Sequence, residues 1–148
     1  MRRLGGMLVL VAFATGLAGC GGKSEAEKER EREAKSGRGT VTCAGKAMSG
    51  ETGLPADFPS IEGVIFVQAS ETGPSHVVDG YAEKGLKELY ESFESGFEDA
   101  GYTVLFDEIE EDDAEVSYKT KDEASEGQVA LRSCDEDKTS VHITNRPE

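Results

Sequence analysis

The most regular hydrophobic pattern in the chain lies between residues 86 and 100. Apolar side chains recur there every three or four residues, with glutamates between them, at Leu86, Leu89, Tyr90, Phe93, Phe97 and Ala100. This spacing gathers them on one face of an α-helix. Gly101 comes next, and glycine readily adopts the left-handed conformation with which many helices end. The pattern predicts an amphipathic helix over residues 86–100.

Four short segments with alternating apolar and polar residues follow this helix. A period of two is typical of a β-strand with one buried and one solvated face. Polar turns separate the segments, which favours antiparallel hairpins. The apolar residues expected to share a face in each segment are, in order, Tyr102, Val104 and Phe106; Val116 and Tyr118; Val129 and Leu131; and Val141 and Ile143.

Two further strands are predicted before the helix. Residues 61–69 are a β-branched and aromatic run, residues 71–75 supply turn formers and residues 76–81 return, so a hairpin is expected. Residues 55–60, PADFPS, are expected to be an irregular lead-in because proline disfavours helix at the preceding residue. The apolar stripe of the helix needs a sheet to cover it. The sequence thus predicts an α+β fold, a single helix packed on a curved antiparallel β-sheet, in the order β-β-α-β-β-β-β.

Charge is unevenly distributed along the 148 residues. The chain has 30 acidic and 16 basic residues and a formal net charge of −14. Residues 40–148 contain 25 of the acidic and 8 of the basic residues, so they carry −17 and are expected to form one small acidic α+β domain. Such a charge repels phosphate backbones, which argues against nucleic acid as a partner.

The first 19 residues have the organisation of an export signal. Arg2 and Arg3 precede the 16 uncharged residues from Leu4 to Gly19, whose centre is apolar. A helix of this length spans about 24 Å, less than the ~30 Å hydrocarbon core of a bilayer. A positive start, a short apolar centre and a small-residue end are typical of a signal peptide; the alternative is an uncleaved anchor helix.

The end of this segment, Leu17-Ala18-Gly19-Cys20, resembles the lipobox of bacterial lipoproteins at all four of its positions. The resemblance implies that residues 1–19 are a lipoprotein signal peptide and that the Cys20 thiol accepts a diacylglyceryl group. Cleavage would make Cys20 the first mature residue, often acylated again, and two or three acyl chains give stable anchoring. The implied location is the cell membrane or outer membrane, with the domain facing the extracytoplasmic space.

Residues 20–39 are expected to be the lipidated N-terminus and a charged flexible tether. From Gly21 to Gly39 no apolar side chain is larger than alanine, and six basic residues alternate with five glutamates. With nothing to bury, such a segment cannot offset the entropy lost on ordering. A short coiled coil is the alternative, but the apolar a and d positions it needs are missing.

Assigning Cys20 to lipid leaves two of the three cysteines, Cys43 and Cys134, in a chain directed out of the cytoplasm. Disulfides form and persist in such compartments, so a Cys43–Cys134 bridge is predicted. Cys134 has the solvated parity of its strand. The bridge is therefore expected to hold the segment from Thr40 to Cys43 over the open face of the sheet.

Residues that could carry chemistry do not form a recognisable site. Residues 107–115 contain seven carboxylates but lack EF-hand spacing, and a solvated hairpin tip accounts for them. His76 and His142 lack a third ligand at zinc-site spacing. Ser140 and His142 would share a strand face, but no orienting acid or oxyanion pocket is evident. We therefore predict no catalytic residues, no metal ligands and no cofactor.

Together these patterns predict a membrane-anchored bacterial lipoprotein that is not an enzyme. Its domain is expected to be an interaction or structural module of the cell envelope, attached to the membrane through lipid on Cys20, with an envelope protein as candidate partner. The alternative is a lipoprotein that binds a small molecule or a divalent cation at the acidic hairpin or at the helix–sheet edge.

Overall fold

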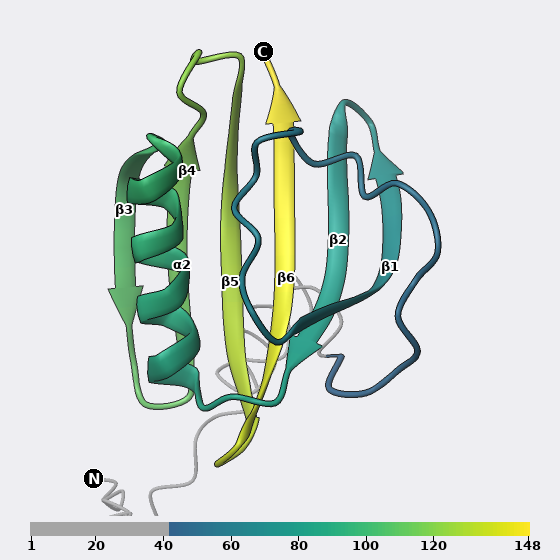
Figure 1. The fold of residues 1–148 in the computed structure, drawn as a ribbon, viewed down its shortest axis with the longest axis vertical. Coiled ribbons are helices and arrows are strands. Elements are labelled where there is room, and N and C mark those ends of the chain that lie inside the picture. The colour runs from purple at the N-terminus through teal and green to yellow at the C-terminus, as the bar shows by residue number, and fades with distance from the viewer. Residues whose placement is uncertain (1–41) are drawn as a thin grey trace, which may run out of the picture. The chain divides into compact units, whose positions relative to one another are not determined.

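The computed structural model describes residues 42–148, which form six strands and one helix (Figure 1). The expected signal peptide over residues 1–19, the lipidation site Cys20 and the tether over residues 20–39 lie outside the described residues. The elements are β1 (Val64–Thr72), β2 (Ser75–Ala82), α2 (Leu86–Ala100), β3 (Thr103–Ile109), β4 (Asp113–Lys119), β5 (Ser125–Asp135) and β6 (Lys138–Pro147).

The strands form one antiparallel sheet in the order β1-β2-β6-β5-β4-β3. The expected α+β fold names the elements only in chain order, β-β-α-β-β-β-β. The structure corrects it in two respects, the arrangement of the strands within the sheet and the share of the domain that is sheet. The sheet does not follow the chain order, because β6 lies between β2 and β5. One helix of 15 residues accompanies six strands of 7 to 11 residues, so the domain is mostly antiparallel sheet.

The connection through α2 explains the strand order. After β2 the chain passes the end of the sheet, α2 then runs along the strands in front of β4 and β3, and β3 starts at the far edge (Figure 1). The hairpins β3–β4, β4–β5 and β5–β6 then fill the sheet back towards β2. β6 pairs with β2 from His76 opposite Asn145 to Ala82 opposite Thr139. Such long-range pairing has no local turn signal, so periodicity could not predict it.

The predicted helix over residues 86–100 is confirmed, and Gly101 ends it with φ 77° and ψ 21°. The Gly101 N–H donates to the Glu98 carbonyl at 3.0 Å, and the Tyr102 N–H donates to the Phe97 carbonyl at 2.9 Å. Glycine adopts this left-handed conformation without the steric cost of a Cβ. The buried residues of α2 all belong to the predicted stripe: Leu86, Leu89, Tyr90, Phe93 and Phe97.

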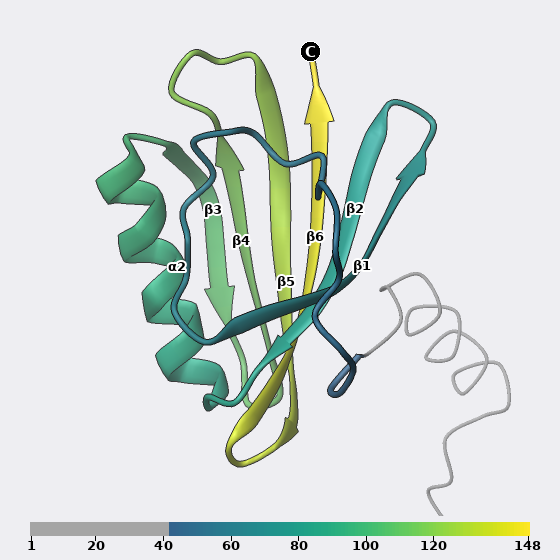
Figure 2. The ribbon, with the colours of Figure 1, turned by 45° about the vertical axis from the view of Figure 1, so that its right-hand side comes forward.

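The irregular segment before β1, which we call the lead-in (residues 42–63), covers part of the sheet that α2 leaves open. It passes round the β1 edge and then crosses the α2 side of the sheet, in front of β2, β6 and β5 (Figures 1 and 2). Ile61 and Pro59 pack closely against the helix at Gly96. A Cβ added to Gly96 would lie only 2.7 Å from the Ile61 side chain, so there is no room for a larger residue. The lead-in is therefore part of the core as well as a connection into β1.

Five aromatic rings form the aromatic cluster at the centre of the core. Phe97 of α2 stacks on Tyr118 of β4 with ring centroids 4.6 Å apart, and on Tyr102 at 5.6 Å. Phe58 of the lead-in meets Phe97 and Tyr118 edge-on at 5.6 Å each, and Phe93 lies 6.1 Å from Phe97. Such pairs contribute about 0.5–1.5 kcal/mol each beyond burial. The cluster joins the lead-in, the helix and the sheet.

Three core tyrosines also donate hydrogen bonds that link separate elements. Desolvation raises the pKa of all three phenols, and the aspartate acceptors add to this effect for Tyr90 and Tyr102. The neutral phenols are therefore the forms that the fold stabilises. The pairs are Tyr90 of α2 with Asp107 of β3 (2.7 Å), Tyr102 with Asp57 of the lead-in (2.9 Å), and Tyr118 of β4 with Asn145 of β6 (3.1 Å).

Replacing Phe58 tests whether the lead-in belongs to the core. We expect Phe58→Ala to lower the free energy of unfolding by about 2–3 kcal/mol, because it removes a ring that packs on Phe97 and Tyr118. Phe106→Ala is the matched control, since Phe106 is 49 % exposed, and it should cost less than about 0.5 kcal/mol. Urea unfolding followed by circular dichroism measures both, and equal costs would contradict the assignment.

The raised phenol pKa values predict a specific alkaline transition. A group whose pKa is higher in the folded than in the unfolded state stabilises the fold below about pH 10, and this contribution is lost as pH rises. The absorbance of tyrosinate at Tyr90, Tyr102 and Tyr118 should therefore appear only together with loss of the near-ultraviolet circular dichroism. Ionisation of these three phenols near pH 10 in a chain that stays folded would refute this.

Candidate functional site

Three large apolar side chains are exposed in the part of the chain that the structure describes, and all three belong to β3. Leu105 is 55 % exposed, Phe106 49 % and Ile109 42 %. β3 is an edge strand that pairs with β4 alone, so its outer backbone has no strand partner among residues 42–148. An edge strand with exposed apolar side chains is a surface on which another chain can pair.

A β-bulge at Leu105 accounts for the exposure of Phe106. Val104 lies opposite Tyr118, which faces the core, but Phe106 lies opposite Ser117, on the other face of the sheet. The extra residue shifts the alternation by one position. The prediction that Tyr102, Val104 and Phe106 share a buried face is therefore wrong at Phe106. Period-two counting cannot detect a bulge, although two consecutive large apolar residues, Leu105 and Phe106, hint at one.

The face of the sheet opposite α2, which we call the open face, is largely polar. Residues paired across the strands form rows on it, and neighbouring rows lie two residues apart along each strand. The first row is Phe106, Ser117, Gln128, Thr144 and Val77, and the second is Glu108, Glu115, Ala130, His142 and Asp79.

An open depression of about 320 Å³ lies on this face between β3 and β6. Its volume is at the lower limit of sites that bind small molecules. One of its polar groups is already engaged, because the Gln128 side-chain amide donates to Glu115 at 2.8 Å. The lining residues are Leu105, Ser117, Glu126, Gly127, Gln128, Thr144 and Arg146.

His142 has an acidic partner that sequence analysis missed. Its Nδ1 lies 2.7 Å from Oδ1 of Asp79, on the neighbouring strand β2. The long-range pairing of β2 with β6 creates this contact, so no sequence motif signals it. Ser140, however, donates its hydroxyl to the Arg132 carbonyl at 3.2 Å and not to the imidazole. Neither Ser140 nor His142 lines the depression.

The seven carboxylates of residues 107–115 do not converge on one point. Asp107 accepts the Tyr90 hydroxyl, and Glu115 accepts the Gln128 amide, so these two are turned towards different elements. The chain turns between Ile109 and Asp113, where the Glu110 N–H donates to the Asp113 carbonyl at 2.7 Å. Within residues 42–148 no group of three or more His, Cys, Asp or Glu side chains is arranged to hold a metal ion.

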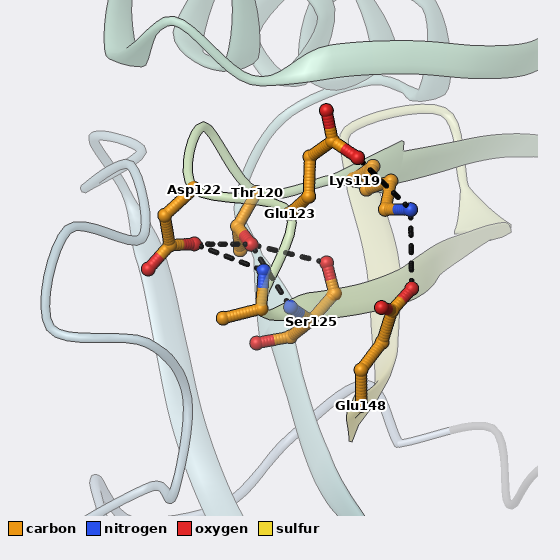
Figure 3. Close-up of polar contacts among 7 residues, drawn as sticks. Lys119, Thr120, Asp122, Glu123, Ser125 and Glu148 are labelled. Atoms are coloured by element: carbon orange, nitrogen blue, oxygen red, sulfur yellow. Dashed lines mark hydrogen bonds and ion pairs between the residues drawn. The ribbon is translucent and has the colours of Figure 1, made fainter.

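The turn between β4 and β5 is held by hydrogen bonds among its own residues, including a pair between Thr120 and Ser125 (Figure 3). The Ala124 N–H donates to the Asp122 carboxylate at 3.1 Å, and this bond together with the Thr120 hydroxyl lowers the pKa of Asp122. Lys119 Nζ lies 3.1 Å from the Glu148 carboxylate, which raises the pKa of the Lys119 amine. Lys119 Nζ also lies 3.6 Å from the carboxylate of Glu123 in the turn, so Lys119 joins the turn to Glu148.

The predicted disulfide between Cys43 and Cys134 is present, with Cα atoms 6.3 Å apart. The segment after Cys43 continues over β2, where the Tyr81 hydroxyl donates to the Gly45 carbonyl at 3.2 Å. It then reaches the β1 edge, where the Met48 N–H donates to the Phe66 carbonyl at 2.8 Å. The bridge therefore fixes the described N-terminal end of the lead-in to β5.

No helix within residues 42–148 is long and apolar enough to cross a membrane. Comparisons with protein-family models, with curated proteins and with solved structures found no match to this chain.

Loss of the disulfide is expected to destabilise the fold strongly. The bridge joins residues 91 apart, and closing a loop of this length contributes at most about 4–5 kcal/mol on the chain-entropy model. Replacing Cys43 and Cys134 by serine should shift the urea midpoint down and make it insensitive to dithiothreitol, whereas dithiothreitol should lower the midpoint of the native chain. An unchanged midpoint in the double variant would contradict the prediction.

Proposed function

We propose that the chain is a bacterial lipoprotein, held at a membrane by lipid on Cys20, whose domain binds an envelope protein without catalysis. The interaction surface is β3 with its exposed side chains Leu105, Phe106 and Ile109. Residues 20–39 act as the tether that separates this surface from the membrane.

The exposure of these three side chains carries the interaction role. Each is between 42 % and 55 % exposed, although the domain buries most of its other large apolar residues. Apolar side chains that gather on one exposed element mark an interaction surface, because burying them against a partner lowers the free energy relative to leaving them in water. The backbone of the same strand is available for pairing on its outer side, which supports recognition of another protein.

The anchoring role is supported by the lipobox resemblance of Leu17-Ala18-Gly19-Cys20 and by the disulfide. A Cys43–Cys134 bridge persists in an oxidising compartment, which agrees with export of the domain. The bridge also lies next to the expected tether in the sequence. A force transmitted from the membrane through the tether would therefore act on β5, inside the sheet, before it could detach the lead-in from the core.

Crosslinking in the bacterium that encodes the chain tests both parts of the proposal. A photo-crosslinking amino acid at position 105 should give a discrete adduct with an envelope protein, whereas the same group at Glu62, exposed and next to the opposite edge strand, should give none. Cys20→Ala should abolish incorporation of labelled palmitate, leave the precursor uncut and remove the adduct.

The two parts can fail separately. Palmitate incorporation that survives Cys20→Ala would refute the lipid anchor. Equal adducts from positions 105 and 62 would refute β3 as the interaction surface.

A further inference from the structure

We propose that the outer edge of β3 binds a partner segment as an added antiparallel strand, and that this segment carries two adjacent basic residues flanked by apolar ones. This inference rests on the proposed function and deepens it, because it states the chemistry of the partner. It is carried by the edge position of β3, by the order of its side chains and by its charge.

The backbone of β3 provides the pairing groups. Its hydrogen bonds to β4 run from Thr103, opposite Lys119, to Ile109, opposite Ala114, and no described strand lies on its other side. Alternate N–H and C=O groups of an edge strand point outwards and can pair with an extended peptide. A strand added there would continue the sheet beyond β3.

The side chains of β3 specify what such a strand should contain. Val104, Leu105 and Phe106 come first, then Asp107 and Glu108, then Ile109. Residues directly opposite each other on neighbouring strands interact most strongly, and pairs of like character or of opposite charge are favoured. Read from its own N-terminus, an antiparallel partner segment should therefore present an apolar residue opposite Ile109, then two basic residues opposite Glu108 and Asp107, and then mainly apolar residues.

The charge of the β3–β4 hairpin favours a basic partner. Glu108 lies directly opposite Glu115, and like charges in this arrangement repel. Glu110 and Glu111 follow in the turn, and no lysine or arginine within residues 42–148 forms an ion pair with Glu108, Glu110 or Glu111. A basic side chain on the added strand would lie beside Glu108 and offset this repulsion.

A second copy of the chain is a poor occupant of the same edge. Pairing of β3 with β3 of another copy would bring two acidic hairpins together, each with seven carboxylates over residues 107–115 and no basic residue. The domains also carry a formal charge of −17 each, from 25 acidic and 8 basic residues. Repulsion between them acts over the Debye length of about 8–10 Å at physiological salt.

The probe for this inference is the capped peptide Thr-Val-Lys-Lys-Val-Thr-Val, titrated into the full-length chain in detergent by calorimetry. We expect saturable binding and slower hydrogen exchange at the amides of β3, with little change in β1. N-methylation of alternate residues keeps the charge but blocks pairing, and should weaken binding by about tenfold or more.

Two variants with the same change in net charge separate edge recognition from general electrostatics. Glu108→Lys with Glu111→Lys should weaken peptide binding by about tenfold or more, because both charges lie on the β3–β4 hairpin. Glu51→Lys with Glu62→Lys, both exposed and located in the lead-in, should leave binding within about twofold. Circular dichroism confirms that each variant is folded.

Three results of the peptide experiments would overturn the inference. They are the absence of binding at millimolar peptide, equal binding of the N-methylated peptide, and exchange protection confined to the open-face depression. Sedimentation that shows self-association through β3, not displaced by the peptide, would do the same. If the peptide does not bind but position 105 gives a specific adduct, strand addition is refuted and the interaction role is retained. If the peptide binds but position 105 gives no adduct, the proposed envelope partner is refuted and the strand-accepting edge is retained.

Discussion

The contact between Phe97 and Tyr118 is the one on which the arrangement of this domain most depends. It places α2 over β4, with ring centroids 4.6 Å apart, and so determines where the chain leaves the helix and begins β3. Once β3 starts at the far edge of the sheet, the remaining hairpins return towards β2 and make β6 a central strand. The same contact thus leaves β3 at an edge, where its outer backbone is available.

The lead-in completes this arrangement from the other end of the chain. Phe58 packs edge-on against both Phe97 and Tyr118, and Asp57 accepts the Tyr102 hydroxyl at 2.9 Å. A single helix of 15 residues cannot cover a sheet of six strands. An irregular segment therefore supplies the second part of the covering layer. Its ordering is entropically costly, and the Cys43–Cys134 bridge reduces that cost by restricting the unfolded chain.

Features that depend on local periodicity could be predicted from the sequence, and features that depend on distant partners could not. The stripe from Leu86 to Phe97 and the ending at Gly101 predict α2 because helix geometry is local. The disulfide follows from a count of cysteines and a compartment. The pairing of β2 with β6 joins residues 63 apart, as at Asp79 and His142, and no local signal identifies it. The fold class was therefore expected wrongly although the helix was placed correctly.

The candidate surface was missed for a similar reason, and that reason is informative about function. One extra residue at Leu105 turns Phe106 from the core to the open face, where it is 49 % exposed. A bulge and nearby carboxylates are also devices by which edge strands avoid pairing with copies of themselves. A carboxylate that repels another copy attracts a basic segment, so protection against self-association and selection of a partner are compatible on one edge. The bulge and the carboxylates account for such protection, but they do not account for Leu105 and Phe106, which are 55 % and 49 % exposed beside Glu108. Their combination with an edge strand is what favours the proposed strand-accepting surface over an edge that is only shielded.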